Sequence, residues 1–126
     1  WYIMMAEQGY GDFTISGRDA LATYGYCSAD PSIMFLELDS EPHFCLDTFF
    51  VPKSKSNEIN IINGIKYAKK EKALLDFIEN DYDDSAIEEC FQFMSDKDID
   101  DFKKYIKEVG KYEKISSDKR WSDYLL

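Results

Sequence analysis

The sequence predicts an α+β domain in which a small, mostly antiparallel sheet of three to four strands is packed by helices and the C-terminal half is helical. Three observations lead to this prediction. Short apolar runs bounded by turn-forming residues are confined to residues 33–68. Apolar residues at helical spacing recur from residue 69 to the end of the chain. Hydrophobic residues make up 44% of the sequence, which is enough to build a core.

Four segments have the features of strands. Residues 33–38 form an apolar run between two proline-containing turn sequences, and residues 43–51 follow as an extended run with two alternating faces. Residues 58–62 and 65–68 flank the pair Asn63-Gly64. Because both residues of that pair tolerate the positive φ of a type I′ turn, we expect a hairpin there.

A short helix is expected before the strands. Ser16 and Asp19 have the spacing of a capping box, in which each side chain accepts a hydrogen bond from the other residue's backbone N–H. Gly25 is expected to end this helix, because glycine readily adopts the left-handed conformation of a C-terminal cap. Five apolar residues of this helix and of the one after residue 69 are expected to pack the helices onto the sheet: Ala20, Leu21, Ala73, Leu74 and Phe77.

The C-terminal half is expected to be a series of helices. A first one begins after Lys69, and capping boxes at Ser85–Glu88 and Ser95–Asp98 predict the starts of two more. Gly110 is expected to end the third. Ser116 or Ser117 is expected to cap a last short helix.

The chain begins at Trp1 without an initiator methionine, so we expect it to be a piece of a longer protein. Residues 1–12 are interrupted by two glycines, and we interpret them as the end of a missing N-terminal part or as a linker. Residues 13–126 are then expected to form a single α/β domain, because their number is typical of one domain. No apolar run approaches the roughly 20 residues that a membrane helix needs, so no membrane partner is expected.

The charge balance bears on the partner. The chain has 15 lysines and arginines against 25 acidic residues, for a net charge of -10. Affinity for nucleic acid depends on neutralising phosphates with cationic side chains, so this balance opposes strong DNA binding. An acidic domain attracts a basic partner and steers its encounter.

The three cysteines are Cys27, Cys45 and Cys90. Their number is odd and no two are close in sequence, so we expect no disulfide framework, a cytoplasmic location and buried free thiols. His43 is the only histidine. It could form a catalytic dyad with Cys45 or a zinc site with all three thiols, but the sequence lacks the closely spaced ligand pairs typical of zinc sites.

The acidic segment at residues 81–89 has two interpretations. A calcium loop of the EF-hand kind would need a central glycine, and none is present. Carboxylates that favour a helix N-terminus explain the same residues. The chain also lacks a phosphate-binding glycine loop and a G-x-S-x-G nucleophile motif. We therefore expect no enzymatic activity, no metal and no cofactor.

Three phrases resemble a known family. They are residues 15–26 (ISGRDALATYGY), residues 63–77 (NGIKYAKKEKALLDF) and residues 119–126 (KRWSDYLL). In order and separation they are similar to elements of AbiEi-type antitoxins, which belong to bacterial abortive-infection (type IV) toxin–antitoxin systems. The resemblance covers most of residues 13–126. It implies a non-enzymatic antitoxin and transcriptional regulator whose missing N-terminal winged helix binds DNA. Its partner would be a nucleotidyltransferase-like toxin.

The expected function is therefore macromolecular recognition by an antitoxin or regulator domain, with an acidic protein–protein interaction domain of a phage or mobile-element accessory protein as the alternative. Two surfaces are candidates. If the partner is DNA, the surface is expected to contain Arg18, Lys69, Lys70 and Lys72. If the partner is a protein, it is expected to contain Asp81, Asp83, Asp84 and exposed aromatic residues. We expect this part of the chain to bind DNA weakly at physiological salt.

Overall fold

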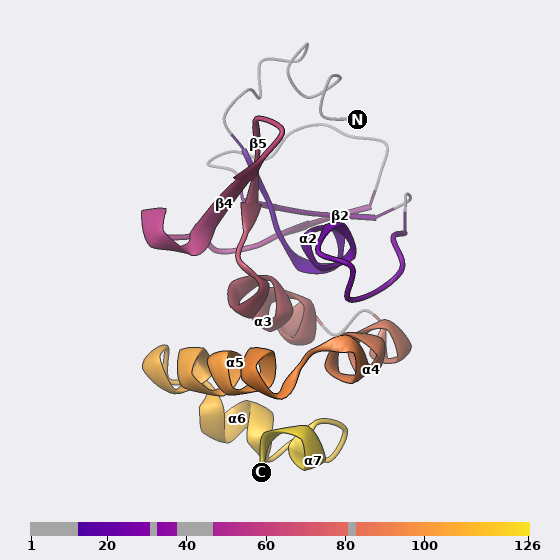
Figure 1. The fold of residues 1–126 in the computed structure, drawn as a ribbon, viewed down its shortest axis with the longest axis vertical. Helices are drawn as coiled ribbons and strands as arrows, with labels where there is room; N and C mark the ends of the chain where they lie inside the picture. The colour runs from indigo at the N-terminus through magenta and orange to yellow at the C-terminus, as the bar shows by residue number, and fades with distance from the viewer. Residues whose placement is uncertain (1–12, 31–32, 38–46, 81–82) are drawn as a thin grey trace.

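The computed structural model describes residues 13–30, 33–37, 47–80 and 83–126. The strands in these ranges are β1 (Thr14–Ile15), β2 (Ile33–Glu37), β3 (Asp47–Phe50), β4 (Ile59–Ile62) and β5 (Ile65–Ala68). The helices are α2 (Gly17–Thr23), α3 (Lys70–Asn80), α4 (Asp84–Phe93), α5 (Asp96–Glu108), α6 (Tyr112–Ser116) and α7 (Ser122–Leu125), with the 3-10 turn η1 (Ser56–Glu58) before β4. This α+β arrangement with a helical C-terminal half confirms the predicted fold class (Figure 1).

The sheet differs from the prediction in strand number and direction. It has five strands in the order β3-β2-β1-β5-β4. β1 runs antiparallel to β2 but parallel to β5, and β2 runs parallel to β3, so the sheet is mixed rather than mostly antiparallel. The strand that the sequence did not indicate is β1, at the centre. Two residues are too few to display an alternating pattern, and the strand exists because both neighbours pair with it.

The hairpin between β4 and β5 is confirmed. Asn63 and Gly64 have φ values of 53° and 79°, as a type I′ turn requires. The strand expected at residues 43–51 is described only from residue 47, and its first four residues lie outside the described ranges. In the described part the alternation holds, since Phe49 stacks on Phe35 in the core and Phe50 is exposed on the other face.

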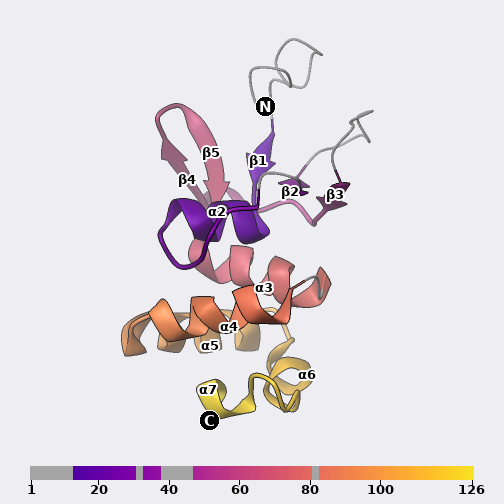
Figure 2. The same ribbon diagram turned by 90° about the vertical axis from the view of Figure 1, so that its right-hand side faces the viewer.

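The helices lie in successive layers below the sheet (Figures 1 and 2). α3 lies between the sheet with α2 on one side and the pair α4 and α5 on the other, and α6 and α7 are farthest from the sheet. All five residues expected to pack helices onto the sheet have 0% exposed surface: Ala20, Leu21, Ala73, Leu74 and Phe77. A second set of core aromatics, in which Phe91 contacts Phe102 and Trp121, joins α4 to α5 and the C-terminal helices.

Of the three predicted capping boxes, one is confirmed and two are wrong. At α5, the Ser95 side chain accepts from the Asp98 N–H and the Asp98 carboxylate accepts from the Ser95 N–H. At α4, the predicted box at Ser85–Glu88 does not form. The helix begins earlier because Asp83 is the N-cap and its carboxylate accepts from the Ala86 N–H across 3.2 Å.

The predicted box at Ser16 is also wrong. Ser16 is the N-cap of α2, but its side chain makes no capping hydrogen bond. Its hydroxyl instead donates to Asp76 of α3, and the Asp19 carboxylate accepts from the Phe35 N–H of β2. Both side chains therefore connect α2 to other elements rather than to its own first turn.

The last helix also begins differently from the prediction. Ser116 is the final residue of α6 and Ser117 is the C-cap of that helix, while Trp121 precedes α7. The sequence indicated one short helix where the structure has two. A turn at residues 117–121 separates them, in which Asp118 accepts from the Arg120 N–H.

Candidate functional site

Arg18 contacts Asp83 of the acidic segment. The sequence had indicated two different surfaces for these two residues. Arg18 is 8% exposed, and its guanidinium donates to the Ser28 carbonyl across 3.0 Å and to Asp83 across 2.9 Å. Asp83 also caps α4, so its carboxylate has two partners within the fold. Asp84 pairs with Arg120 across 2.8 Å. Asp81 lies outside the described residues.

Lys72 is buried in an ionic cluster between the sheet and α3. It is 4% exposed, and its ammonium lies 2.9 Å from Glu37 and 2.6 Å from Asp76. The Ser16 hydroxyl donates to the same Asp76 oxygen, and the Ser54 hydroxyl donates to Glu37. Burial raises the pKa of Asp76 to about 6, against the opposing effect of the Lys72 charge. Lys72 therefore connects strand β2 to helix α3 and is not on the surface.

Lys69 and Lys70 are at the surface, beside a pocket of about 410 Å³ where α3 begins. Lys69 is exposed and Lys70 is half-buried. Six residues line the pocket: Tyr24, Tyr26, Asn60, Lys69, Lys70 and Glu71. Of the four cations expected to form one DNA-contacting surface, these two alone are adjacent and accessible, because the other two are buried.

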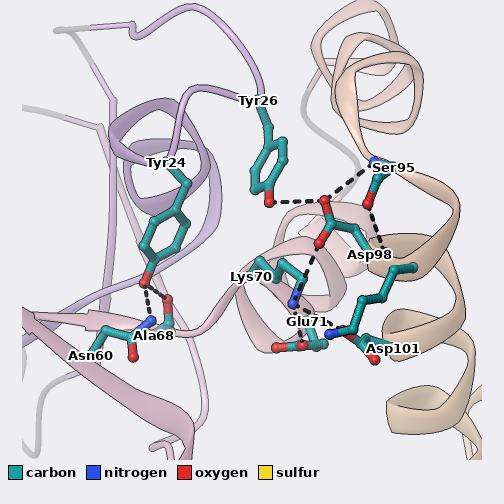
Figure 3. Close-up of polar contacts among 10 residues, drawn as sticks. Tyr24, Tyr26, Asn60, Ala68, Lys70, Glu71, Ser95, Asp98 and Asp101 are labelled. Atoms are coloured by element: carbon teal, nitrogen blue, oxygen red, sulfur yellow. Dashed lines mark hydrogen bonds and ion pairs between the residues drawn. The ribbon is translucent and has the colours of Figure 1, made fainter.

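Two tyrosines are among the residues that line this pocket, and Figure 3 shows the hydrogen bonds of their hydroxyls. Tyr24 donates from its hydroxyl to the Ala68 carbonyl across 2.7 Å and accepts from the Asn60 amide across 3.2 Å. Burial raises the pKa of the Tyr24 hydroxyl, so it remains a donor at neutral pH. The Tyr26 hydroxyl donates to Asp98 of α5 across 3.1 Å. The centroids of the two rings are 6.5 Å apart in an edge-to-face contact. Each tyrosine is therefore held both by its ring and by the hydrogen bond of its hydroxyl.

Asp98 has two structural roles at once. One carboxylate oxygen accepts from both the Tyr26 hydroxyl and the Ser95 N–H. Partial burial opposes ionisation of Asp98, but these hydrogen bonds and the Lys70 charge lower its pKa below the usual value. The carboxylate that completes the capping box of α5 therefore also holds Tyr26 of the pocket, which connects the position of Tyr26 to the start of that helix.

Lys70 is held by three carboxylates. Its ammonium lies 2.8 Å from Glu71, 3.3 Å from Asp101 and 3.7 Å from Asp98. Partial burial lowers the pKa of Lys70, but the hydrogen bonds to Glu71 and Asp101 outweigh it and raise that pKa. Lys70 therefore stays charged, but the three neighbouring carboxylates carry more negative charge than its ammonium carries positive charge. It cannot offer a phosphate the net attraction that nucleic-acid binding requires.

No protein-family model, curated protein or solved structure matches this chain. The residues themselves are therefore the basis for a proposed function. Within residues 13–30, 33–37, 47–80 and 83–126, no group of three or more histidine, cysteine or acidic residues could hold a metal ion. His43 and Cys45, the candidates for a dyad or a zinc site, lie outside those ranges. No helix in the described part of the chain is long and apolar enough to cross a membrane.

The sequence indicated the two lysines of the pocket but not its other lining residues. Tyr24, the C-cap of α2, is half-buried, and the sequence did not indicate the hydrogen bonds of its hydroxyl. Tyr26, Asn60 and the Asp98 that holds Tyr26 come from a turn, a strand and a helix far apart in sequence. No local pattern could associate them, because the sheet order and the packing of α5 on α3 bring them together.

Proposed function

We propose that this chain is a non-catalytic recognition domain of an antitoxin or regulator from a bacterial abortive-infection toxin–antitoxin system, and that it binds a basic protein partner at the tyrosine-lined pocket. The observation that supports it best is the state of Lys70. Three carboxylates, those of Glu71, Asp98 and Asp101, surround that single ammonium beside two fixed tyrosine rings. Even when the exposed Lys69 on the pocket wall is counted, these three carboxylates outnumber the two lysines, which favours a cationic side chain over a phosphate.

Tyrosines suit a protein partner. Tyrosine is enriched at the centres of protein interfaces because a rigid ring contributes a large apolar area while its hydroxyl makes a hydrogen bond. The rings of Tyr24 and Tyr26 are already held by Ala68 and Asp98. Little side-chain entropy would therefore be lost when a partner packs against them.

The distribution of cations supports the same preference. Arg18 and Lys72 are enclosed by carboxylates inside the fold, and Arg120 pairs with Asp84 and Asp118. With a net charge of -10, the chain as a whole attracts a basic protein and repels nucleic acid. The resemblance to AbiEi-type antitoxins supplies the kind of partner, a nucleotidyltransferase-like toxin. Any operator binding would belong to a winged helix outside this chain.

The test is neutralisation of a toxin in cells. The nucleotidyltransferase-like protein encoded next to this chain's gene is expressed alone and together with the chain, and growth is measured. We expect growth arrest by the toxin alone and recovery with the wild-type chain. Replacing Tyr26 with alanine should reduce the recovery, whereas Phe93→Ala, at a 67% exposed position on α4, should preserve it.

Two outcomes would contradict the proposal. If no nucleotidyltransferase-like gene lies beside this one, the chain is better described as an interaction domain of a phage or mobile-element accessory protein. If the toxin arrests growth and the soluble chain fails to restore it, direct neutralisation is excluded. Circular dichroism of the Tyr26→Ala protein establishes whether a loss of recovery reflects the pocket or the fold.

A further inference from the structure

Two cysteines that are far apart in sequence meet between the turn after α2 and helix α4. Cys27 is half-buried in the segment that follows Gly25, and Cys90 is fully buried in α4 with 0% exposed surface. Both are free thiols, and each one affects the pKa of the other. The third cysteine, Cys45, lies outside the described residues.

Neighbouring residues hold the two thiols together. The Ser28 N–H donates to the Glu89 carboxylate across 2.8 Å, and these residues directly follow Cys27 and directly precede Cys90. On the other side, the Arg18 guanidinium donates to the Ser28 carbonyl and to Asp83 at the start of α4. The segments that carry Cys27 and Cys90 are therefore held together from both flanks.

The two thiols differ in their readiness to ionise. The hydrogen bond from Cys90 lowers the pKa of Cys27, burial opposes this, and the positive charge of Arg18 adds to the lowering. The same hydrogen bond and burial raise the pKa of Cys90. The more accessible sulfur is thus the better nucleophile, and the buried one remains protonated beside it. In the reduced protein, the Cys27 sulfur also lies 3.8 Å from the Arg18 carbonyl oxygen.

We propose that Cys27 and Cys90 form a reversible intramolecular disulfide when the protein meets a hydroperoxide. With hydrogen peroxide, the Cys27 thiolate attacks one peroxide oxygen, the O–O bond breaks and Cys27 becomes a sulfenic acid, while the leaving hydroxide takes up the proton that Cys27 had released and departs as water. The Cys90 sulfur then attacks the Cys27 sulfur, the S–O bond breaks and a second water leaves with the Cys90 proton. For hydrogen peroxide, two thiols lose two electrons and one peroxide becomes two waters.

The bond would join two parts of the molecule: the sheet half, which contains the strands and α2, and the helical half, which contains α3 to α7. It would connect the segment between α2 and β2 to α4, which the hydrogen bond from Ser28 to Glu89 already brings together. Since the closed loop is long, cross-linking should remove much conformational freedom from the unfolded chain. This inference does not depend on the proposed partner, although Tyr26 of the pocket directly precedes Cys27.

The test uses the full chain carrying Cys45→Ser, so that Cys27 and Cys90 are the only thiols. The reduced protein is treated with one equivalent of hydrogen peroxide, free thiols are alkylated, and the mass is measured. We expect two thiols to be lost together, a Cys27–Cys90 peptide link and full recovery with dithiothreitol. The oxidised monomer should have a Tm higher by roughly 10 °C.

A second variant separates the two steps. With Cys90→Ala added, Cys27 should accumulate as a sulfenic acid that reacts with dimedone, and no disulfide should form within the molecule. The inference is overturned if both thiols of the Cys45→Ser protein remain alkylatable after excess peroxide. It is also overturned if the only disulfides link two molecules, which a non-reducing gel shows directly. Since these readouts use the Cys45→Ser protein, they decide the matter even if Cys90→Ala fails to fold.

Discussion

Arg18 donates to Asp83 across 2.9 Å and thereby joins the first turn of α2 to the N-cap of α4. From the sequence alone, these residues were expected on two different surfaces for two different partners. In the fold they neutralise each other, and Arg18 also satisfies the Ser28 carbonyl. Arg18 thus stabilises the contact between the sheet half and the helical half, and its charge is not available to DNA.

Arg18→Met should therefore destabilise the fold. The substitution keeps much of the apolar volume but leaves Asp83 and the Ser28 carbonyl without their donor. Because Asp83 is one-third exposed, water compensates in part, and we expect a loss of about 2 kcal/mol in the free energy of unfolding. Urea denaturation measures it. Lys97→Met, at a lysine side chain that is 86% exposed, is the matched control and should change stability by less than about 0.5 kcal/mol.

Lys72→Met should cost more. Lys72 is the cation between Glu37 and Asp76, and all three side chains are buried. Removing it leaves two carboxylates together without a counter-charge, so we expect a loss of about 3–5 kcal/mol in urea denaturation. Acidification should recover part of this loss, because protonation relieves the repulsion. A Lys72→Met protein as stable as the wild type would show that the cluster is not a net source of stability.

The close approach of Gly17 to Phe35 gives a third prediction. Gly17 has φ +54°, and a Cβ placed there would lie 2.3 Å from Cγ of the Phe35 ring. Gly17→Ala should therefore separate α2 from β2 and cost at least about 3 kcal/mol. Gly25→Ala is the control, since Gly25 also has positive φ but a Cβ there meets nothing within 4 Å. It should cost only about 1 kcal/mol. Equal losses in thermal unfolding would contradict the steric explanation.

Stability should fall as pH rises from about 4 to about 6. Burial raises the pKa of Asp19 and of Asp76 from 3.8 to about 6. In this interval the folded state keeps protons that the unfolded chain releases, so the free energy of unfolding decreases with increasing pH and levels off above the interval. The lowered pKa values of Asp98 and Asp118 act at lower pH and with the opposite sign.

Urea titrations across that interval test this dependence. Asp19→Asn keeps an acceptor for the Phe35 N–H and removes one of the two titrating groups, so its slope against pH should be shallower than that of the wild type. A slope that is unchanged in Asp19→Asn, or a wild-type stability that increases with pH in this interval, would be inconsistent with the buried carboxyls.

The sequence predicted those elements whose signals are local. Asn63-Gly64 fixes its hairpin by backbone conformation, and Ser95 with Asp98 starts α5 by a capping box. Residues whose partners are distant in sequence were misinterpreted. Ser16 has the spacing of a capping residue, but a buried carboxylate 60 positions away is its actual partner. In the sequence, Lys72 resembles a lysine on the solvent-exposed face of a helix. Its partner Glu37 is distant in sequence and becomes its neighbour only in the folded protein.

We propose above all that the pocket binds a basic protein rather than nucleic acid. Reversing the charge of a lysine at the pocket distinguishes these two kinds of partner. Lys69 is an exposed lysine on the pocket wall, whereas Lys119 is an exposed lysine in the turn between α6 and α7. Lys69→Glu and Lys119→Glu change the net charge equally. A difference in affinity between the two variants therefore comes from the pocket and not from long-range electrostatic steering.

The decisive measurement is isothermal titration calorimetry of the wild-type chain and the two variants against the nucleotidyltransferase-like protein that we propose as the partner, at about 150 mM salt. We predict that Lys69→Glu tightens binding about fivefold or more relative to Lys119→Glu, because it adds a carboxylate where a cationic side chain docks. Weaker binding by Lys69→Glu than by Lys119→Glu, or no binding by the wild-type chain, would contradict the account.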